Sequence, residues 1–94
     1  MKESKKLERI FKGVANHRRI EIIKLIEKEP GITLFAIART LQCNFKTISE
    51  HTRRLVAAGL ANKQYRGNSV EHYLSPYGSK VIEFMKEFSK SQEY

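Results

Sequence analysis

Residues 33–75 constrain the fold of this chain more strongly than any other part of the sequence. They have the pattern of a short helix, a tight turn, a second helix and a basic hairpin. In the second helix, Ile48, Thr52 and Leu55 are spaced at i, i+4 and i+7, which predicts one stripe facing a core. The polar and cationic residues on its other faces remain free to meet a partner. A helix supported from behind in this way is suited to reading the major groove of DNA.

Two helices are predicted before this segment. Four apolar residues with the spacing of one helical face predict a helix over residues 3–14: Leu7, Ile10, Phe11 and Val14. Asn16 is a suitable N-cap for the next helix. That helix should end at Glu29, because Pro30 disfavours helical geometry in the residue before it.

The central segment begins with a predicted helix-turn-helix over residues 33–59. Thr33 and Asn44 are suitable N-caps for its two helices. Gly59 can end the second helix, because a glycine just past a helix adopts the left-handed conformation at little cost.

A predicted β-hairpin, the wing, follows over residues 61–74, where alternating residues flank Gly67-Asn68. A last amphipathic helix is predicted over residues 77–90. We therefore expect a single, mainly α-helical domain over residues 1–94 with a small β-hairpin wing.

The chain is strongly basic, with 18 Lys and Arg residues against 10 acidic residues and a net charge of +8. For so small a domain this balance indicates a polyanionic partner, nucleic acid first and an anionic membrane surface second. No apolar run in the sequence approaches the roughly 18 residues that cross a bilayer, and the basic N-terminus lacks the apolar stretch of a secretion signal. We therefore expect a cytoplasmic protein that binds double-stranded DNA and no membrane.

Four stretches between about residues 14 and 80 correspond to the second helix, the supporting helix, the recognition helix, and the return strand of the wing with the entry to the last helix. They are ANHRRIEIIKLI, ITLFAIARTL, NFKTISEHTRRLVAAGL and VEHYLSPYG. Together they resemble the winged helix-turn-helix proteins of the ArsR type, which are small bacterial and archaeal transcription repressors. The resemblance implies a sequence-specific DNA-binding regulator with a repressor's role.

The chain departs from the metal-sensing members of that family. Thr33 and Phe35 stand where such members often carry a Cys-x-Cys pair, and no histidine follows His72. Cys43 is the only cysteine, and the three histidines show no paired ligand spacing. We therefore expect no metal, no cofactor and no metal sensing.

The candidate DNA-contacting residues of the helix-turn-helix lie at the start or on the outward faces of its second helix. They are Asn44, Phe45, Lys46, Thr47, Ser49, Glu50, Arg53 and Arg54. Cationic side chains can donate to guanine or phosphate, and hydroxyls can serve a base edge or a phosphate. Phe45 stands where relatives often carry a polar residue. The alternative is a solvated helix face, on which Glu50 pairs with Arg53 or Arg54 instead of accepting from a cytosine amino group.

The candidates on the wing are polar or basic and lie on or beside its tip: Lys63, Arg66, Asn68 and Ser69. A basic ribbon can reach the minor groove or the backbone, and phosphate contact is favoured here over base readout. Arg18 and Arg19 could touch the DNA backbone or be surface charges. Cys43, in the turn, could be a redox switch or a small packing residue.

A homodimer is predicted, with its interface on the first and last helices, because neither has another obvious partner in so small a chain. The predicted interface residues are Leu7, Ile10, Phe11, Val14, Val81, Met85 and Phe88. Several further aromatics exceed what the inward faces require, and some should complete the core or the subunit contact: Phe35, Phe45, Tyr65, Tyr77 and Phe84. The sequence does not indicate an effector, an operator or the direction of regulation.

Enzyme function is not expected. The sequence contains no aspartate, no Gly-rich phosphate loop and no nucleophile-and-base pair at a recognisable spacing. Two other interpretations stay open: a winged-helix module that binds protein, and an architectural protein that binds DNA without sequence preference. The net charge and the cationic wing favour DNA over protein as the partner.

Overall fold

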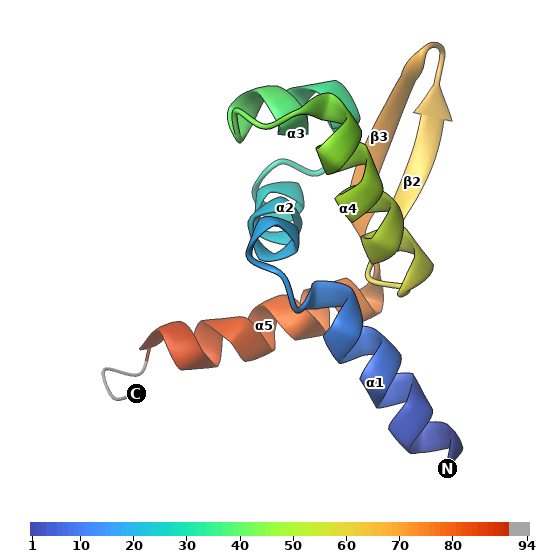
Figure 1. The fold of residues 1–94 in the computed structure, drawn as a ribbon. Coiled ribbons are helices and arrows are strands. Elements are labelled where there is room, and N and C mark those ends of the chain that lie inside the picture. Colours follow the sequence, from blue (N-terminus) through green and yellow to red (C-terminus); the bar gives the residue numbers. More distant parts are fainter. Residues whose placement is uncertain (91–94) are drawn as a thin grey trace.

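The computed structural model describes residues 1–90, which form five helices and a three-stranded antiparallel sheet (Figure 1). The helices are α1 (Lys2–Val14), α2 (His17–Lys28), α3 (Leu34–Thr40), α4 (Phe45–Ala57) and α5 (Pro76–Lys90). The strands are β1 (Ile32–Thr33), β2 (Ala61–Arg66) and β3 (Ser69–Leu74). The mainly α-helical class with a small β wing is therefore confirmed.

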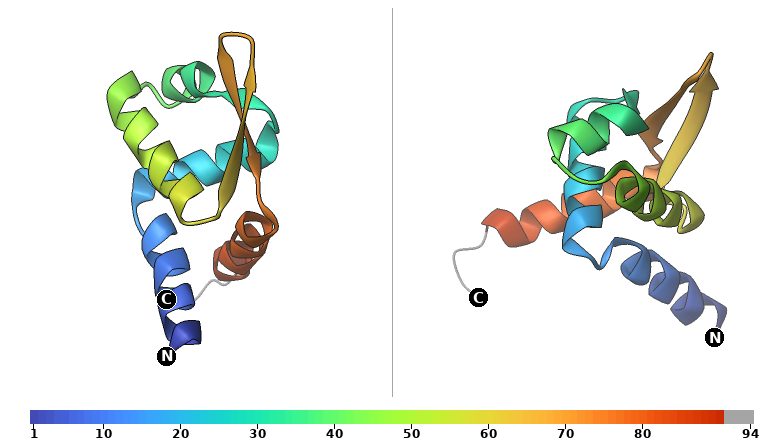
Figure 2. Two further views of the ribbon diagram at one scale, coloured as in Figure 1. Left: turned by 90° about the vertical axis from the view of Figure 1, so that its right-hand side faces the viewer. Right: turned by 45° about the horizontal axis from the view of Figure 1, so that its top comes forward.

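The elements divide between two ends of the molecule. Helices α2, α3 and α4 pack together, and the β2–β3 hairpin extends beside α4 (Figure 1). Helices α1 and α5 lie at the opposite end from the hairpin tip, and both project away from the core (Figures 1 and 2). None of the helices within residues 1–90 is long and apolar enough to cross a membrane.

The core is built mainly from β-branched and leucine side chains. Its fully buried members are Ile22, Ile23, Ile26, Ile37, Ile48, Leu55 and Leu60. The stripe predicted for α4 is confirmed, because Thr52 is also buried, beside Ile48 and Leu55. Helix α4 is thus held from one side, and the face opposite the buried stripe is exposed.

The predicted N-caps are confirmed by side-chain hydrogen bonds. Asn16 accepts from the backbone N–H groups of Arg18 and Arg19, at 2.9 and 3.2 Å. Thr33 accepts from the backbone N–H of Ala36 at 3.1 Å. These bonds satisfy amide groups that have no partner within the first turn of a helix.

The sheet has the order β1-β3-β2. The hairpin pairs Ala61 with Leu74 at its base and Arg66 with Ser69 at its tip, where Gly67 has a φ of +60°. Strand β1, which the sequence did not predict, adds a third strand by pairing Ile32 with His72. The wing is therefore anchored to the segment between α2 and α3 as well as to α4.

Candidate nucleic-acid interface

The exposed face of α4 brings together most of the candidates that were predicted on the helix-turn-helix. Lys46, Thr47, Glu50, Arg53 and Arg54 are all exposed on the side away from the buried stripe. This set is called the outward face of α4 below. It combines three cations, one carboxylate and one hydroxyl on a supported helix.

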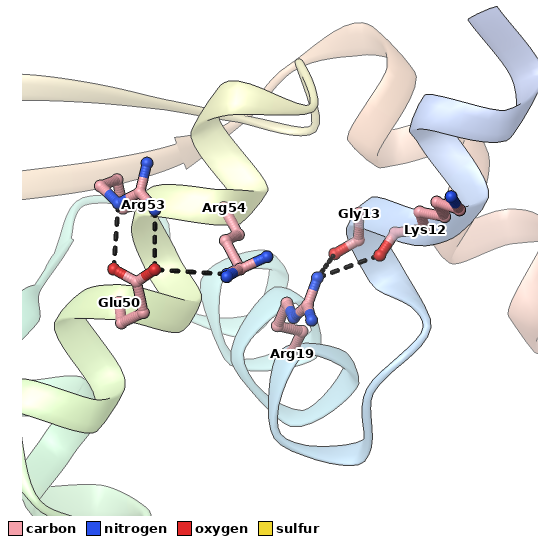
Figure 3. Close-up of polar contacts among 6 residues, drawn as sticks. All are labelled: Lys12, Gly13, Arg19, Glu50, Arg53 and Arg54. Carbon is pink, nitrogen blue, oxygen red and sulfur yellow. Dashed lines mark hydrogen bonds and ion pairs between the residues drawn. The ribbon is translucent and has the colours of Figure 1, made fainter. Parts of the chain in front are cut away.

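Glu50 holds both arginines of this face (Figure 3). Arg53 donates from Nε to Oε2 at 3.0 Å and from Nη2 to Oε1 at 2.7 Å. Arg54 donates from Nε to Oε1 at 3.3 Å. The hydrogen bonds from Arg53, aided by the charges of both guanidinium groups, lower the pKa of Glu50 from 4.5 to about 2. The carboxylate therefore stays ionised near neutral pH and offsets one of the two positive charges.

Asn44 has a structural task at the start of α4. Its side-chain oxygen accepts from the backbone N–H groups of Lys46 and Thr47, at 2.8 and 3.2 Å. That oxygen is therefore engaged, and only the amide NH₂ group of Asn44 is left for an external partner.

A cleft of about 260 Å³ separates α4 from the wing. Ser49 and Arg53 line it from α4, and Lys63 and Tyr65 line it from β2. His72 lies at the same cleft and is buried. Ser49 is half-buried there, so it lies between helix and wing, unlike the fully exposed residues of the outward face.

The wing candidates are all exposed: Lys63, Arg66, Asn68 and Ser69. Arg66 is restrained by an ion pair from its Nε to Oε2 of Glu71 at 3.0 Å. The other carboxylate oxygen of Glu71 accepts from the hydroxyl of Tyr73 at 2.9 Å. The basic side chain nearest the tip is therefore positioned by a partner on the neighbouring strand, which the sequence pattern did not indicate.

Comparison with known protein families identifies the domain. Residues 16–61 match the family described as winged helix-turn-helix DNA-binding. The chain contains a winged helix-turn-helix domain. Helix α3 is its supporting helix, α4 its recognition helix and the β2–β3 hairpin its wing.

Solved structures with this fold cover almost the whole chain. HlyU from Vibrio cholerae N16961 is 23% identical, with a TM-score of 0.81 over 97% of this chain and 98% of that one. The homodimeric winged helix-turn-helix domain of Mb0332 from Mycobacterium bovis, described as a possible ArsR-family regulator, is 19% identical, with a TM-score of 0.76 over 96% and 88%. NolR from Sinorhizobium fredii is 19% identical, with a TM-score of 0.83 over 93% and 87%. The fold predicted from the sequence is confirmed, and one neighbour, Mb0332, is described as a possible member of the ArsR family, which the sequence resembles. No curated protein sequence matches the chain.

Arg19, on α2, has a structural role: it holds α1 and α2 together. Its Nη1 donates to the carbonyl oxygens of Lys12 and Gly13, at 3.0 Å each, and so joins the end of α1 to α2 (Figure 3). Arg18 pairs with Glu21 at 3.0 Å. The sequence left two readings for Arg19, contact with the DNA backbone or a surface charge, and neither of them included this internal hydrogen bond.

The faces of α1 and α5 carry large exposed apolar side chains. Leu7, Phe11 and Phe88 are about half exposed or more. Phe84, which the sequence offered only for the core or the subunit contact, joins them on α5, with ring centroids 6.3 Å from Phe11 and 5.0 Å from Phe88. Val14, also predicted at the interface, is only 9% exposed and belongs to the core of its own chain.

The remaining predicted interface residues are partly covered within the chain: Ile10, Val81 and Met85 pack against the core. Cys43 is also half-buried against the core, which favours its reading as a packing residue. Across residues 1–90, no three His, Cys, Asp or Glu side chains are placed together to hold a metal ion.

Proposed function

We propose that this protein is a homodimeric, sequence-specific DNA-binding transcription regulator of the ArsR type, that it acts as a repressor, and that it does not sense metal. The observation that carries the proposal is the outward face of α4. Its cations and hydroxyl stand on a helix whose opposite side is fixed by Ile48, Thr52 and Leu55. A rigid helix of this composition can enter the major groove and donate to base edges.

The wing supports the same proposal from a second element. Lys63 and Arg66 lie on the β2–β3 hairpin, an antiparallel ribbon that extends beside α4 (Figure 1), and they can meet the DNA backbone while α4 meets the bases. The net charge of +8 adds a sequence-independent attraction to the phosphates.

The exposed apolar residues of α1 and α5 support a homodimer. Leu7, Phe11, Phe84 and Phe88 form a contiguous surface that a second copy could cover by two-fold symmetry. Mb0332, which shares the fold, is described as homodimeric.

The proposal of no metal sensing rests on Thr33 and Phe35, which occupy the positions where metal-sensing relatives carry thiols. Zinc or cadmium should therefore leave DNA affinity unchanged. A tenfold loosening of the complex by zinc, about 1.4 kcal/mol of coupling, would overturn this part of the proposal.

The function is tested by DNA binding of the full chain. A mobility shift with random duplex at low salt should show binding, and selection from a random pool should enrich one operator. With roughly six to ten phosphates engaged, affinity should fall about a thousandfold or more between 50 and 200 mM salt. An absence of binding at low salt would favour a protein-binding module, and binding without enrichment would favour an architectural role.

Two matched variants separate base reading from charge. Arg53→Ala should cost about 1–3 kcal/mol on the selected operator and less on random DNA, if Arg53 makes a bidentate base contact. Arg66→Ala should weaken both duplexes alike, and lower the salt slope by about one ion per subunit. Equal losses on both duplexes for both variants would contradict sequence-specific reading by α4. A reporter driven by a promoter that contains the operator then tests repression, because expression should rise when the protein is removed.

A further inference from the structure

Two exposed phenylalanines form an apolar pair on the helix-turn-helix. Phe35 lies near the start of α3 and is 69% exposed, and Phe45 is the first residue of α4 and is 49% exposed. Their ring centroids are 6.1 Å apart, with an angle of 51° between the ring planes. With Ala38 and Cys43 they line a shallow hollow of about 340 Å³.

Exposure of these two rings does not serve the stability of the fold. Helices α3 and α4 are in contact and already have buried side chains of their own, Ile37 and Ala38 on α3 and Ile48 on α4. Large aromatic side chains bury 150–250 Å² each when they are covered, so leaving two of them in water forgoes a large stabilisation. The pair therefore has the character of a contact surface.

The charges around the pair indicate what covers it. Arg39 lines the same hollow, and Lys46 follows Phe45 directly. Helix α3 and the first turn of α4 contain no acidic residue. An apolar pair with cationic neighbours fits a polyanion that also presents apolar groups.

The position of the pair separates it from the proposed dimer surface. Helix α3 and the start of α4 lie at one end of the molecule, whereas α1 and α5 project from the other end (Figures 1 and 2). A second copy seated on α1 and α5 would leave Phe35 and Phe45 uncovered.

We propose that Phe45, braced by Phe35, reads thymine methyl groups in the major groove. This inference rests on the proposed function. Residues at the N-terminus of a recognition helix contact base edges, and the C5-methyl of thymine is the apolar group that the major groove presents to a side chain such as phenylalanine. Phe35 packs against the other ring and restricts where Phe45 can go. The operator therefore carries thymine beneath the start of α4, next to the position that Lys46 reaches.

The test removes single methyl groups from the DNA. The operator selected with the full-length protein is prepared with deoxyuridine in place of each thymidine in turn, which deletes one methyl and keeps every hydrogen-bonding group. Wild type should lose about fourfold in affinity at one or two thymines per half-site, the loss expected for about 0.8 kcal/mol per buried methyl. The other thymines should show no such loss.

Protein variants are combined with the change from thymine to uracil in a double-mutant cycle. Phe45→Ala should bind the thymine and uracil operators equally, Phe45→Leu should keep part of the difference, and Phe35→Ala should reduce it. These side chains are exposed, so the variants should keep the thermal stability of wild type. A methyl effect that is unchanged in Phe45→Ala, or that no thymine shows, overturns the inference while specific DNA binding stands. If wild type enriches no operator at all, the proposed function falls, and this inference with it.

Discussion

Glu50 sets how much positive charge the recognition helix presents to DNA. One carboxylate accepts hydrogen bonds from both Arg53 and Arg54, and its pKa of about 2 keeps it ionised. An ionised carboxylate repels phosphates and also competes with them for the guanidinium groups. Glu50 therefore opposes binding that depends on charge alone.

Glu50→Gln should consequently tighten binding to random DNA and reduce the ratio of the affinity for the operator to the affinity for random duplex. The salt slope should steepen by about one ion per subunit, because an additional cation is free for a phosphate. Fluorescence anisotropy over a salt series measures both effects. Glu83→Gln, an equal change in charge on α5, is the control and should keep the discrimination of wild type. Weaker binding of Glu50→Gln to random DNA would contradict this account.

His72 should make the stability of the fold depend on pH. It is 2% exposed, and its Nδ1 lies 3.4 Å from the carbonyl oxygen of Ile32. Burial, with a smaller effect from the charge of Lys63, lowers the pKa of His72 below its usual 6.5. As the pH falls to about 6.5, the unfolded chain therefore binds a proton at this histidine more readily than the folded chain does. The free energy of unfolding should consequently fall as the pH drops below about 6.5.

His72→Gln should flatten this dependence between pH 7 and pH 5, as measured by urea unfolding at each pH. Burial also lowers the pKa of His51, followed in effect by the charges of Arg19 and Arg54, so part of the slope should remain. His17→Gln replaces a histidine at an exposed position and is the matched control, which should change the slope less than His72→Gln does. An unchanged slope in His72→Gln would show that the buried imidazole is not responsible.

At the scale of elements, Ser75 joins the wing to α5. Its hydroxyl donates to the carbonyl oxygen of Gly59 at 2.6 Å and accepts from the backbone N–H of Gly78 at 3.0 Å. Helix α5 also lies close to the backbone just before β2, since a Cβ added at Gly78 would meet the carbonyl oxygen of Leu60. Both features fix the direction in which α5 leaves the core.

Ser75→Ala should therefore lower the free energy of unfolding by about 0.5–2 kcal/mol, because it removes the N-cap bond to Gly78 and the part-buried hydrogen bond to the carbonyl oxygen of Gly59. Ser79→Ala, at an exposed position of the same helix, should change it by less than about 0.5 kcal/mol. Thermal or urea unfolding distinguishes the two. Equal effects of the two variants would rule out a special contribution from Ser75.

Local signals explain why most elements could be predicted from the sequence. Asn16, Thr33 and Asn44 act on backbone groups two or three residues away, so their spacing is visible in the sequence. Strand β1 was missed because it has two residues and its partner strand lies about forty positions away. A pairing of that kind depends on the assembled fold, and no local pattern indicates it.

In the candidate site, too, contacts between residues close in sequence could be predicted, whereas contacts that depend on the assembled fold could not. The pairing of Glu50 with Arg53 and Arg54 could be read from spacings of three and four residues. The bond from Arg19 to the end of α1 could not, because it depends on the angle between two helices. For the same reason, the apolar stripe of α1 could not show that Val14 is buried within its own chain.

At the scale of the whole molecule, the exposed apolar surface on α1 and α5 leads to the last prediction. Leu7, Phe11, Phe84 and Phe88 keep roughly half or more of their surface in water, although they are clustered. Such clustered patches are uncommon on monomers, and two-fold symmetry is the usual way to cover one. The two-fold axis would also present two recognition helices to half-sites about 34–36 Å apart, one turn of DNA.

Sedimentation equilibrium at micromolar concentration should therefore give twice the mass of one chain. Phe84→Glu or Phe88→Glu should yield the single-chain mass, because a carboxylate would be buried without a partner at the interface. Phe35→Glu, which changes an equally exposed aromatic at the other end of the molecule, should remain a dimer. The monomeric variants should also lose most of their preference for the intact operator over a single half-site, because each chain then binds alone. A wild-type protein that sediments as one chain would remove the basis for paired half-sites and require each chain to read DNA by itself.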